Sequence, residues 1–138
     1  MTRIAPYQAK HFEGVDRLWR TVFPDDPARN QAHNAIPAKL ELNDGLFWVA
    51  LTGDNAVIGT IMAGWDGHRG WLYAVAVDPT CRRSGRGRML VDHALKELSR
   101  RGCNKVNLQI RKGNEEVAAF YRTLGFAIEQ RTSMGKEL

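Results

Sequence analysis

Two glycines within a run of arginines form the stretch with the clearest chemical potential. Gly85 and Gly87 lie between an apolar run that ends at Val77 and a helical pattern that starts near Met89. Glycine lets the backbone approach a ligand closely, and unpaired N–H groups at a helix N-terminus attract anions. Main-chain N–H groups in this stretch are therefore expected to hold a phosphate or diphosphate. The stretch consists of Arg82, Arg83, Ser84, Gly85, Arg86, Gly87 and Arg88.

This glycine pattern differs from two other phosphate-binding motifs. It lacks the Gly-Lys-Ser/Thr of a nucleotide P-loop, and Leu90 stands where a dinucleotide fingerprint has Gly or Ala. An ordinary strand-to-helix turn is the structural alternative. The net charge of +5, from 20 Lys and Arg against 15 Asp and Glu, suits a polyanionic partner, but also a solvated basic surface.

Hydrophobic periodicity predicts the elements that must position these glycines. Alternation predicts three consecutive antiparallel strands, then a helix, a strand, a helix and a strand, so the fold class is α/β with one mixed sheet and helices on its faces. The 138 residues fit a single domain, 1–138. The expected strands are Arg3–Tyr7, Leu46–Leu51, Val57–Trp65, Trp71–Val77, Val106–Ile110 and Phe126–Ser133, and the expected helices are Gln8–Phe23, Met89–Arg101 and Glu115–Leu124, with a short or broken helix in 24–43 around Pro37.

Two sequence blocks carry a family resemblance. Arg82-x-x-Gly85-x-Gly87, after an apolar strand and Asp78-Pro79, resembles the (Gln/Arg)-x-x-Gly-x-(Gly/Ala) acyl-CoA signature of the GNAT superfamily of N-acetyltransferases. Asn114 followed by Phe120–Phe126 is similar to that family's C-terminal pattern. Residues 66–70 and Arg101-Gly102-Cys103 further resemble the small bacterial YpeA-like group.

The resemblance implies a mostly antiparallel sheet of about six strands in which 71–77 splays from 105–111. The pantetheine arm of acetyl-CoA would lie along the opened strand edge. Backbone N–H groups at Val75, Ala76 or Val77 would polarise the thioester carbonyl. It implies direct transfer of acetyl from acetyl-CoA to a primary amine of a small molecule or protein, without a metal. The alternative is an acyl-CoA-binding sensor or partner domain that does not catalyse transfer.

Family similarity also assigns roles to Tyr121 and Asn114. A phenol with a pKa near ~10 can donate a proton to a departing thiolate whose thiol has a pKa near ~8.5, so Tyr121 is the expected general acid. Its structural alternative is a core aromatic on the predicted helix. Asn114 would bind the pantetheine, or else cap the start of that helix.

The general base is open at the level of sequence. An amine with a pKa near ~10.4 must lose a proton before attack, yet the strands 71–77 and 106–110 contain no carboxylate. The candidates are Asp66, His68, Asp78, and a water chain past Tyr73 and Gln109.

Composition places further bounds on partners and compartment. No apolar run approaches the ~20 residues that cross a bilayer, and the N-terminus lacks a secretory signal, so a cytoplasmic protein without membrane contact is expected. The arginines around 82–101 lack the stacking aromatics of a single-strand binder, so no nucleic-acid partner is expected. Cys81 and Cys103 are expected to be reduced thiols. By analogy with the family, a homodimer is expected.

Overall fold

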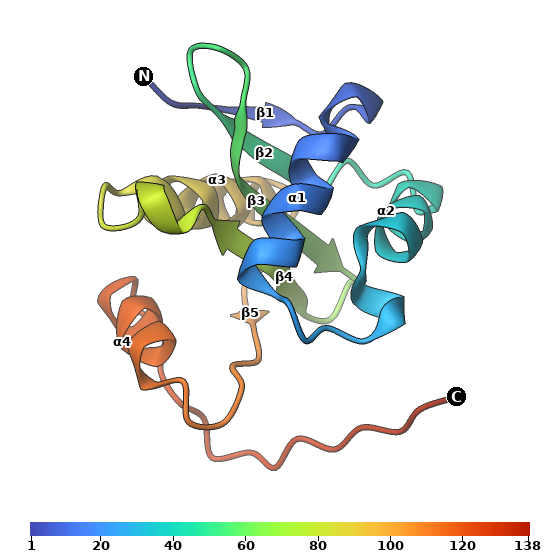
Figure 1. The fold of residues 1–138 in the computed structure, drawn as a ribbon. Coiled ribbons are helices and arrows are strands. Elements are labelled where there is room, and N and C mark those ends of the chain that lie inside the picture. Colours follow the sequence, from blue (N-terminus) through green and yellow to red (C-terminus); the bar gives the residue numbers. More distant parts are fainter. The chain divides into compact units, whose positions relative to one another are not determined.

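A computed structural model describes all residues 1–138, in two compact units, 1–108 and 109–138. The first unit contains a five-stranded sheet in the order β1-β2-β3-β4-β5 (Figure 1). Its first four strands pair antiparallel and β5 pairs parallel to β4. The strands are β1 (Arg3–Pro6), β2 (Phe47–Leu51), β3 (Val57–Trp65), β4 (Gly70–Val77) and β5 (Val106–Asn107).

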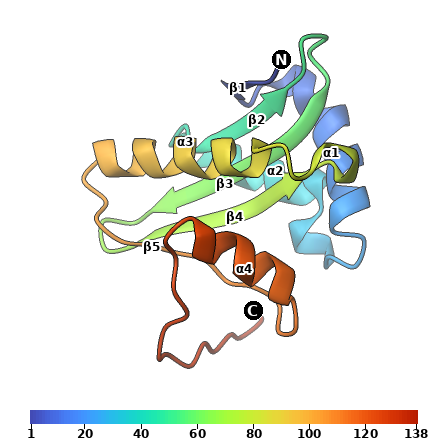
Figure 2. The same ribbon diagram turned by 90° about the vertical axis from the view of Figure 1, so that its left-hand side faces the viewer.

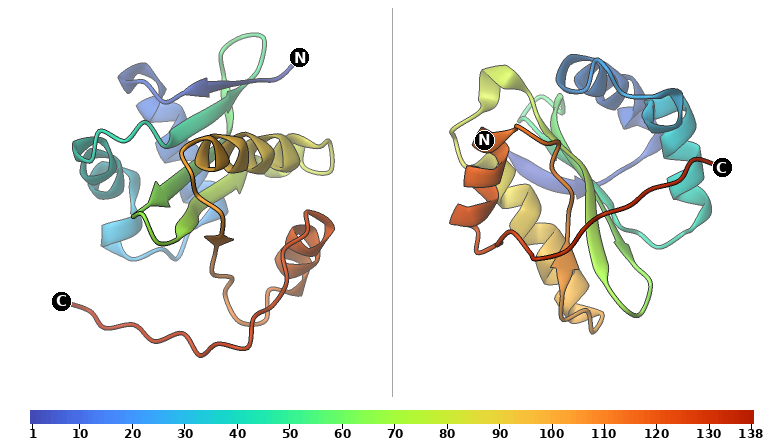
Figure 3. Two further views of the ribbon diagram at one scale, coloured as in Figure 1. Left: turned by 180° about the vertical axis from the view of Figure 1, so that it is seen from behind. Right: turned by 90° about the horizontal axis from the view of Figure 1, so that it is seen from below.

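Helices cover both faces of this sheet, as the sequence predicts. One face carries α1 (Phe12–Val22) and α2 (Ala32–Glu41), and the other carries α3 (Arg86–Arg100), which crosses β3 and β4 (Figures 1 and 2). The view from behind shows α3 alone over its side of the first unit's sheet (Figure 3). Buried residues recur on α3 at Leu90, Val91, Ala94 and Leu98, which matches the expected apolar stripe. Gly102, with φ of 99°, ends this helix as predicted.

The stretch 24–43 is more regular than expected. A 3-10 turn at Ala28–Asn30 leads into α2, which continues through Pro37 rather than breaking there. Proline removes one backbone donor, but the buried Ala32 and Ile36 pack α2 against α1 and the sheet. Packing of this face therefore outweighs the lost hydrogen bond.

The predicted strands after α3 are shorter or absent, which corrects the expected count of about six. Only Val106–Asn107 of the expected Val106–Ile110 pairs with β4. Phe126–Ser133 forms no strand, and Ile128 there is 71% exposed. A strand requires a neighbour for its ladder of hydrogen bonds, and apolar alternation alone supplies none. The second unit contains one helix, α4 (Glu115–Thr123).

No helix combines the length and the apolar character needed to cross a bilayer. No cluster of three or more His, Cys, Asp or Glu side chains is arranged to hold a metal ion. Both cysteines are free thiols, as expected.

Close packing of α3 on the sheet leads to a first prediction, at Gly59 of β3. A Cβ atom there would lie 2.8 Å from Leu90 Cδ1 and 3.1 Å from the Ala76 carbonyl oxygen. Because Leu90 is fully buried, it cannot move aside easily, and Gly59→Ala should lower the free energy of unfolding by about 1 to 3 kcal/mol. Gly53→Ala is the control, since its Cβ would meet nothing within 4 Å. Equal melting temperatures for the two variants would contradict this account.

Candidate active site

The predicted phosphate site at residues 82–88, the cradle, joins the end of β4 to the start of α3. Arg83 and Gly85 adopt left-handed backbone conformations, with φ of 64° and 80°, and α3 begins at Arg86. Gly85 occupies the N-cap position, and no side chain caps the helix. The first N–H groups of a helix lack a carbonyl partner within it. The N–H groups of Arg86, Gly87 and Arg88 can therefore point at an anion, which the helix dipole also favours.

Arginine side chains in the cradle brace the loop itself. Arg82 Nε donates to the Val77 carbonyl at 3.3 Å, which ties the loop to the end of β4. Arg86 donates to Thr2 Oγ1 at 3.0 Å and also to Ser84 Oγ, which in turn donates to the Cys81 carbonyl. Arg86 thus connects the loop to the chain segment before β1.

The edge of β4 next to β5 is open over most of its length. Only Gly70 and Trp71 pair with β5, and β4 continues to Val77. Within the first unit, pairing between β4 and β5 therefore ends at Trp71 and Asn107, as the predicted splay requires. Val75, Ala76 and Val77 lie on the unpaired part of this edge, directly before the cradle. Unpaired strand backbone can hydrogen-bond an extended ligand as an added strand.

The second unit carries Asn114 and Tyr121, whose placement relative to the cradle is not determined. Asn114 caps α4, because its Oδ1 accepts from the Val117 N–H at 3.3 Å. Tyr121 is 6% exposed and contacts Phe120 and Phe126 edge to face, at centroid distances of 5.0 and 5.4 Å. Burial raises the pKa of Tyr121 to about 12. The phenol is therefore protonated throughout the neutral range.

Asp66 and Asp78, the two carboxylates considered as general bases, accept hydrogen bonds that stabilise local turns. Asp66 Oδ1 accepts from the N–H groups of His68 and Arg69, at 2.7 and 2.8 Å. Asp78 accepts from the backbone N–H and the hydroxyl of Thr80, at 2.9 and 2.7 Å. These hydrogen bonds stabilise the charged forms and hold the pKa of each carboxyl below its usual value. Such groups are weak proton acceptors.

The remaining base candidates lie in different units. His68 is exposed in the β3–β4 turn, and Tyr73 on β4 is 51% exposed. Gln109 belongs to the second unit, where its amide donates to Ser133. Solvent therefore reaches Tyr73, and water has access to this part of β4.

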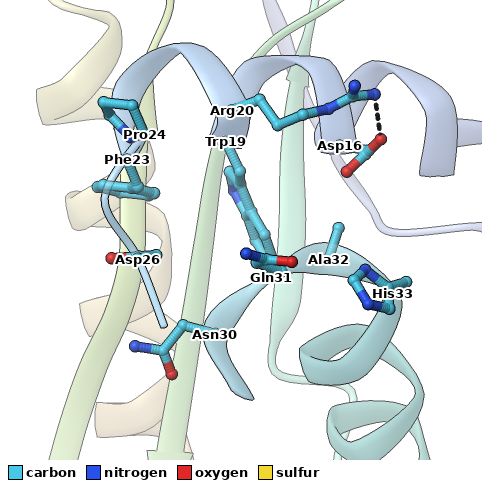
Figure 4. A pocket seen from close by; sticks show the side chains of 10 residues that line it. All are labelled: Asp16, Trp19, Arg20, Phe23, Pro24, Asp26, Asn30, Gln31, Ala32 and His33. Atoms are coloured by element: carbon cyan, nitrogen blue, oxygen red, sulfur yellow. Dashed lines mark hydrogen bonds and ion pairs between the residues drawn. The ribbon is translucent and has the colours of Figure 1, made fainter. Parts of the chain in front are cut away.

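A cavity of about 520 Å³ opens between α1 and the segment leading into α2 (Figure 4). Trp19 forms part of its wall, with the indole ring running from α1 toward Gln31. Asp16 on the rim pairs with Arg20. The lining residues are Asp16, Trp19, Arg20, Phe23, Pro24, Asp26, Asn30, Gln31, Ala32 and His33.

Residues 10–126 match the model of the Acetyltransferase (GNAT) family, which covers the cradle, the open strand edge and α4. The chain belongs to this family. The chain is similar to Acetyltransferase YE1169 of Yersinia enterocolitica, 34% identical over 135 residues that span 98% of this chain and 94% of that protein.

Solved structures share the GNAT fold. Ard1 from Thermoplasma volcanium superposes with a TM-score of 0.82 at 25% identity, over 93% of this chain and 84% of that one. PaiA N-acetyltransferase from Thermoplasma acidophilum, solved with coenzyme A, has a TM-score of 0.81 at 16% identity, over 96% and 93% of the two chains. The predicted family and the mixed sheet are thus confirmed.

Sequence reasoning missed a polar contact beneath the open edge. Thr60 on β3 is fully buried, donates to the Ala74 carbonyl at 2.8 Å and accepts from Trp19 Nε1 at 2.9 Å. In sequence, Thr60 lies between Gly59 and Ile61 in an apolar strand and Trp19 lies on an apolar helix stripe. A threonine inside an otherwise apolar buried strand was the available signal, because buried hydroxyls need partners.

Proposed function

We propose that this GNAT protein transfers an acetyl group from acetyl-CoA to a primary amine of a small molecule or a protein. The observation that supports this most directly is the uncapped, glycine-initiated N-terminus of α3 placed directly after the open edge of β4. The cradle suits a diphosphate and the edge suits an extended amide-containing arm. Both features belong to one unit and one continuous stretch of chain.

The chain would act by binding and polarisation, without a covalent enzyme intermediate. Acetyl-CoA supplies the reactive thioester. N–H groups of residues 82–88 hold its diphosphate, and an N–H on 75–77 hydrogen-bonds the carbonyl oxygen, where negative charge develops. The amine nitrogen bonds to the carbonyl carbon, the carbon–sulfur bond breaks, and the sulfur takes the electron pair. The products are an N-acetyl amine and free CoA thiol.

Two proton movements complete the reaction. Tyr121 is proposed to hydrogen-bond the departing sulfur and to deliver the proton that makes the thiol. The proton from the attacking amine passes to water, since Asp66 and Asp78 are held in turns. The 520 Å³ cavity beside Trp19 is proposed to admit the acceptor.

A binding and turnover experiment tests this function. Acetyl-CoA should raise the melting temperature of the purified protein, and thiol release should accelerate with some member of a panel of polyamines, amino sugars and N-terminal peptides. The paired control is an Arg82→Ala/Gly85→Val double variant, which should lose both effects. Stabilisation by acetyl-CoA without transfer to any amine would favour a non-catalytic acyl-CoA sensor, and no binding would reject both functions.

A further inference from the structure

The backbone of β4 is irregular at the point where it leaves β5. Ala74 has a left-handed φ of 48°, which is unusual for a residue other than glycine. Thr60 pairs with Ala76 and Met62 with Tyr73, so two residues of β4 face Ile61 on β3. This is a β-bulge, a feature that re-aims backbone groups locally. An alanine in this conformation requires support from surrounding contacts.

A chain of two hydrogen bonds supplies that support. Thr60 Oγ1 lies 2.8 Å from the Ala74 carbonyl oxygen, and Trp19 Nε1 lies 2.9 Å from Thr60 Oγ1. A carbonyl can only accept and an indole N–H can only donate. The Thr60 hydroxyl proton must therefore point at Ala74, and Trp19 fixes the hydroxyl from the other side. Thr60 is 0% exposed and Trp19 is 4% exposed, so the hydroxyl of Thr60 is held by protein groups rather than by bulk water.

The hydrogen bond to the Ala74 carbonyl also constrains the orientation of the Val75 N–H, because both groups belong to the same peptide plane. The peptide linking Ala74 to Val75 is trans, as are all others in the chain. Its planar C=O and N–H groups point in opposite directions. Because the Ala74 carbonyl points at the Thr60 hydroxyl, which lies on the α1 side of β3, the Val75 N–H points away from that hydroxyl. Within the first unit, the edge of β4 away from β3 is unpaired beyond Trp71, so it is the edge at which this N–H can meet a ligand.

We infer that Trp19 and Thr60 are positioning residues that hold the Val75 N–H toward the thioester carbonyl of acetyl-CoA. The inference depends on the proposed function, since it concerns the polarising N–H of that reaction. A donor that stabilises an oxyanion is effective when its direction is fixed before the charge develops. Without the Thr60 hydroxyl, the Ala74 carbonyl loses its partner, and the bulge can relax to regular pairing that turns the Val75 N–H away.

The carbonyl stretch of bound [1-13C]acetyl-CoA, measured by infrared difference spectroscopy, tests this without any acceptor. In the wild-type protein the band should lie at lower wavenumber than in free acetyl-CoA, because the hydrogen bond weakens the C=O bond. Thr60→Val should return the band to the free position, and Thr60→Ser, which keeps the hydroxyl, should retain the shift. Trp19→Phe should reduce it in part.

Trp48→Phe is the matched control, since Trp48 is 5% exposed on β2, close to the 4% of Trp19. It should keep the wild-type band. Affinity for CoA itself, which has no acetyl carbonyl, should fall far less than kcat in every variant, because residues 82–88 are untouched and only contacts of the pantetheine arm along β4 can change. With an acceptor amine identified in the turnover experiment, Thr60→Val should lower kcat by about 10- to 100-fold. Complete removal of one oxyanion donor typically lowers kcat by about 100- to 1,000-fold, and here the donor is misdirected rather than removed.

Three results would overturn the inference. A wild-type band at the free position would show that no N–H polarises the carbonyl. An unchanged shift in both Thr60→Val and Trp19→Phe would show that another contact directs Val75, and Trp19→Phe keeps this outcome measurable if Thr60→Val does not fold. Wild-type protein that fails to bind acetyl-CoA at all would instead reject the proposed function, and the inference with it.

Discussion

Tyr121→Phe is expected to lower acetyl transfer by about 10²- to 10⁴-fold, the usual contribution of a positioned proton donor. The dissociation constant for acetyl-CoA should change little, because the variant keeps the aromatic ring that contacts Phe120 and Phe126. Steady-state kinetics and calorimetry measure the two quantities. Tyr7→Phe is the control, a hydroxyl deletion beside β1 that should leave kcat within about twofold. Unchanged turnover in Tyr121→Phe would remove Tyr121 from the reaction.

The same residue sets an expectation for pH dependence. A proton donor is active while it is protonated, so its contribution persists below its pKa and is lost as pH rises through that value. The pKa of Tyr121 is raised to about 12 by burial. The wild-type pH profile of kcat should therefore show no decline attributable to this phenol near pH ~10, its ordinary pKa. A decline there that disappears in Tyr121→Phe would contradict the buried environment of Tyr121.

Gly85→Val is expected to raise the dissociation constant for CoA by about 10- to 100-fold. Gly85 has φ of 80°, a conformation that β-branched residues avoid. Relaxation of this residue would displace the N–H groups of Arg86 and Gly87 that follow it. Each hydrogen bond to a charged group contributes about 1.5 to 3 kcal/mol, and 1.4 kcal/mol corresponds to tenfold in affinity. Isothermal titration with CoA measures the change.

Gly67→Val separates this local effect from general strain. Gly67 has φ of 89°, and a Cβ atom at Gly67 or at Gly85 would meet nothing within 4 Å. Both variants should lose similar stability on thermal unfolding, because both force a branched side chain into a left-handed conformation. Only Gly85→Val should weaken CoA binding. Equal losses of CoA affinity in the two variants would show that the turn at 82–88 does not hold the diphosphate.

The elements around the cradle were predictable because each has a strong local signal. Val57–Trp65 begins and ends where alternation places it, and Gly102 ends α3 through its left-handed backbone. The glycines at 85 and 87 likewise predict the turn, although α3 begins at Arg86, three residues before the expected start at Met89. In these cases the local preference of the chain and its packing in the sheet agree.

Features that depend on distant pairing were not predictable. Phe126–Ser133 alternates like a strand but has no neighbouring strand to pair with. The residues 71–77 read as a regular strand, and nothing in their pattern indicates a bulge at Ala74. That bulge depends on Thr60, 14 residues away, and on Trp19, 41 residues before Thr60. Hydrogen bonds between residues so far apart in the chain produce no hydrophobic periodicity from which they could be predicted.

Trp19 belongs to two environments at once, since one part of its indole lines the 520 Å³ cavity and its N–H holds Thr60. If the cavity admits the acceptor as proposed, an amine that fits it would leave this ring in place, whereas an oversized amine would displace it. Selectivity between acceptors would then be expressed in the rate of the chemical step as well as in binding strength. Poor substrates of this enzyme would bind and yet react slowly.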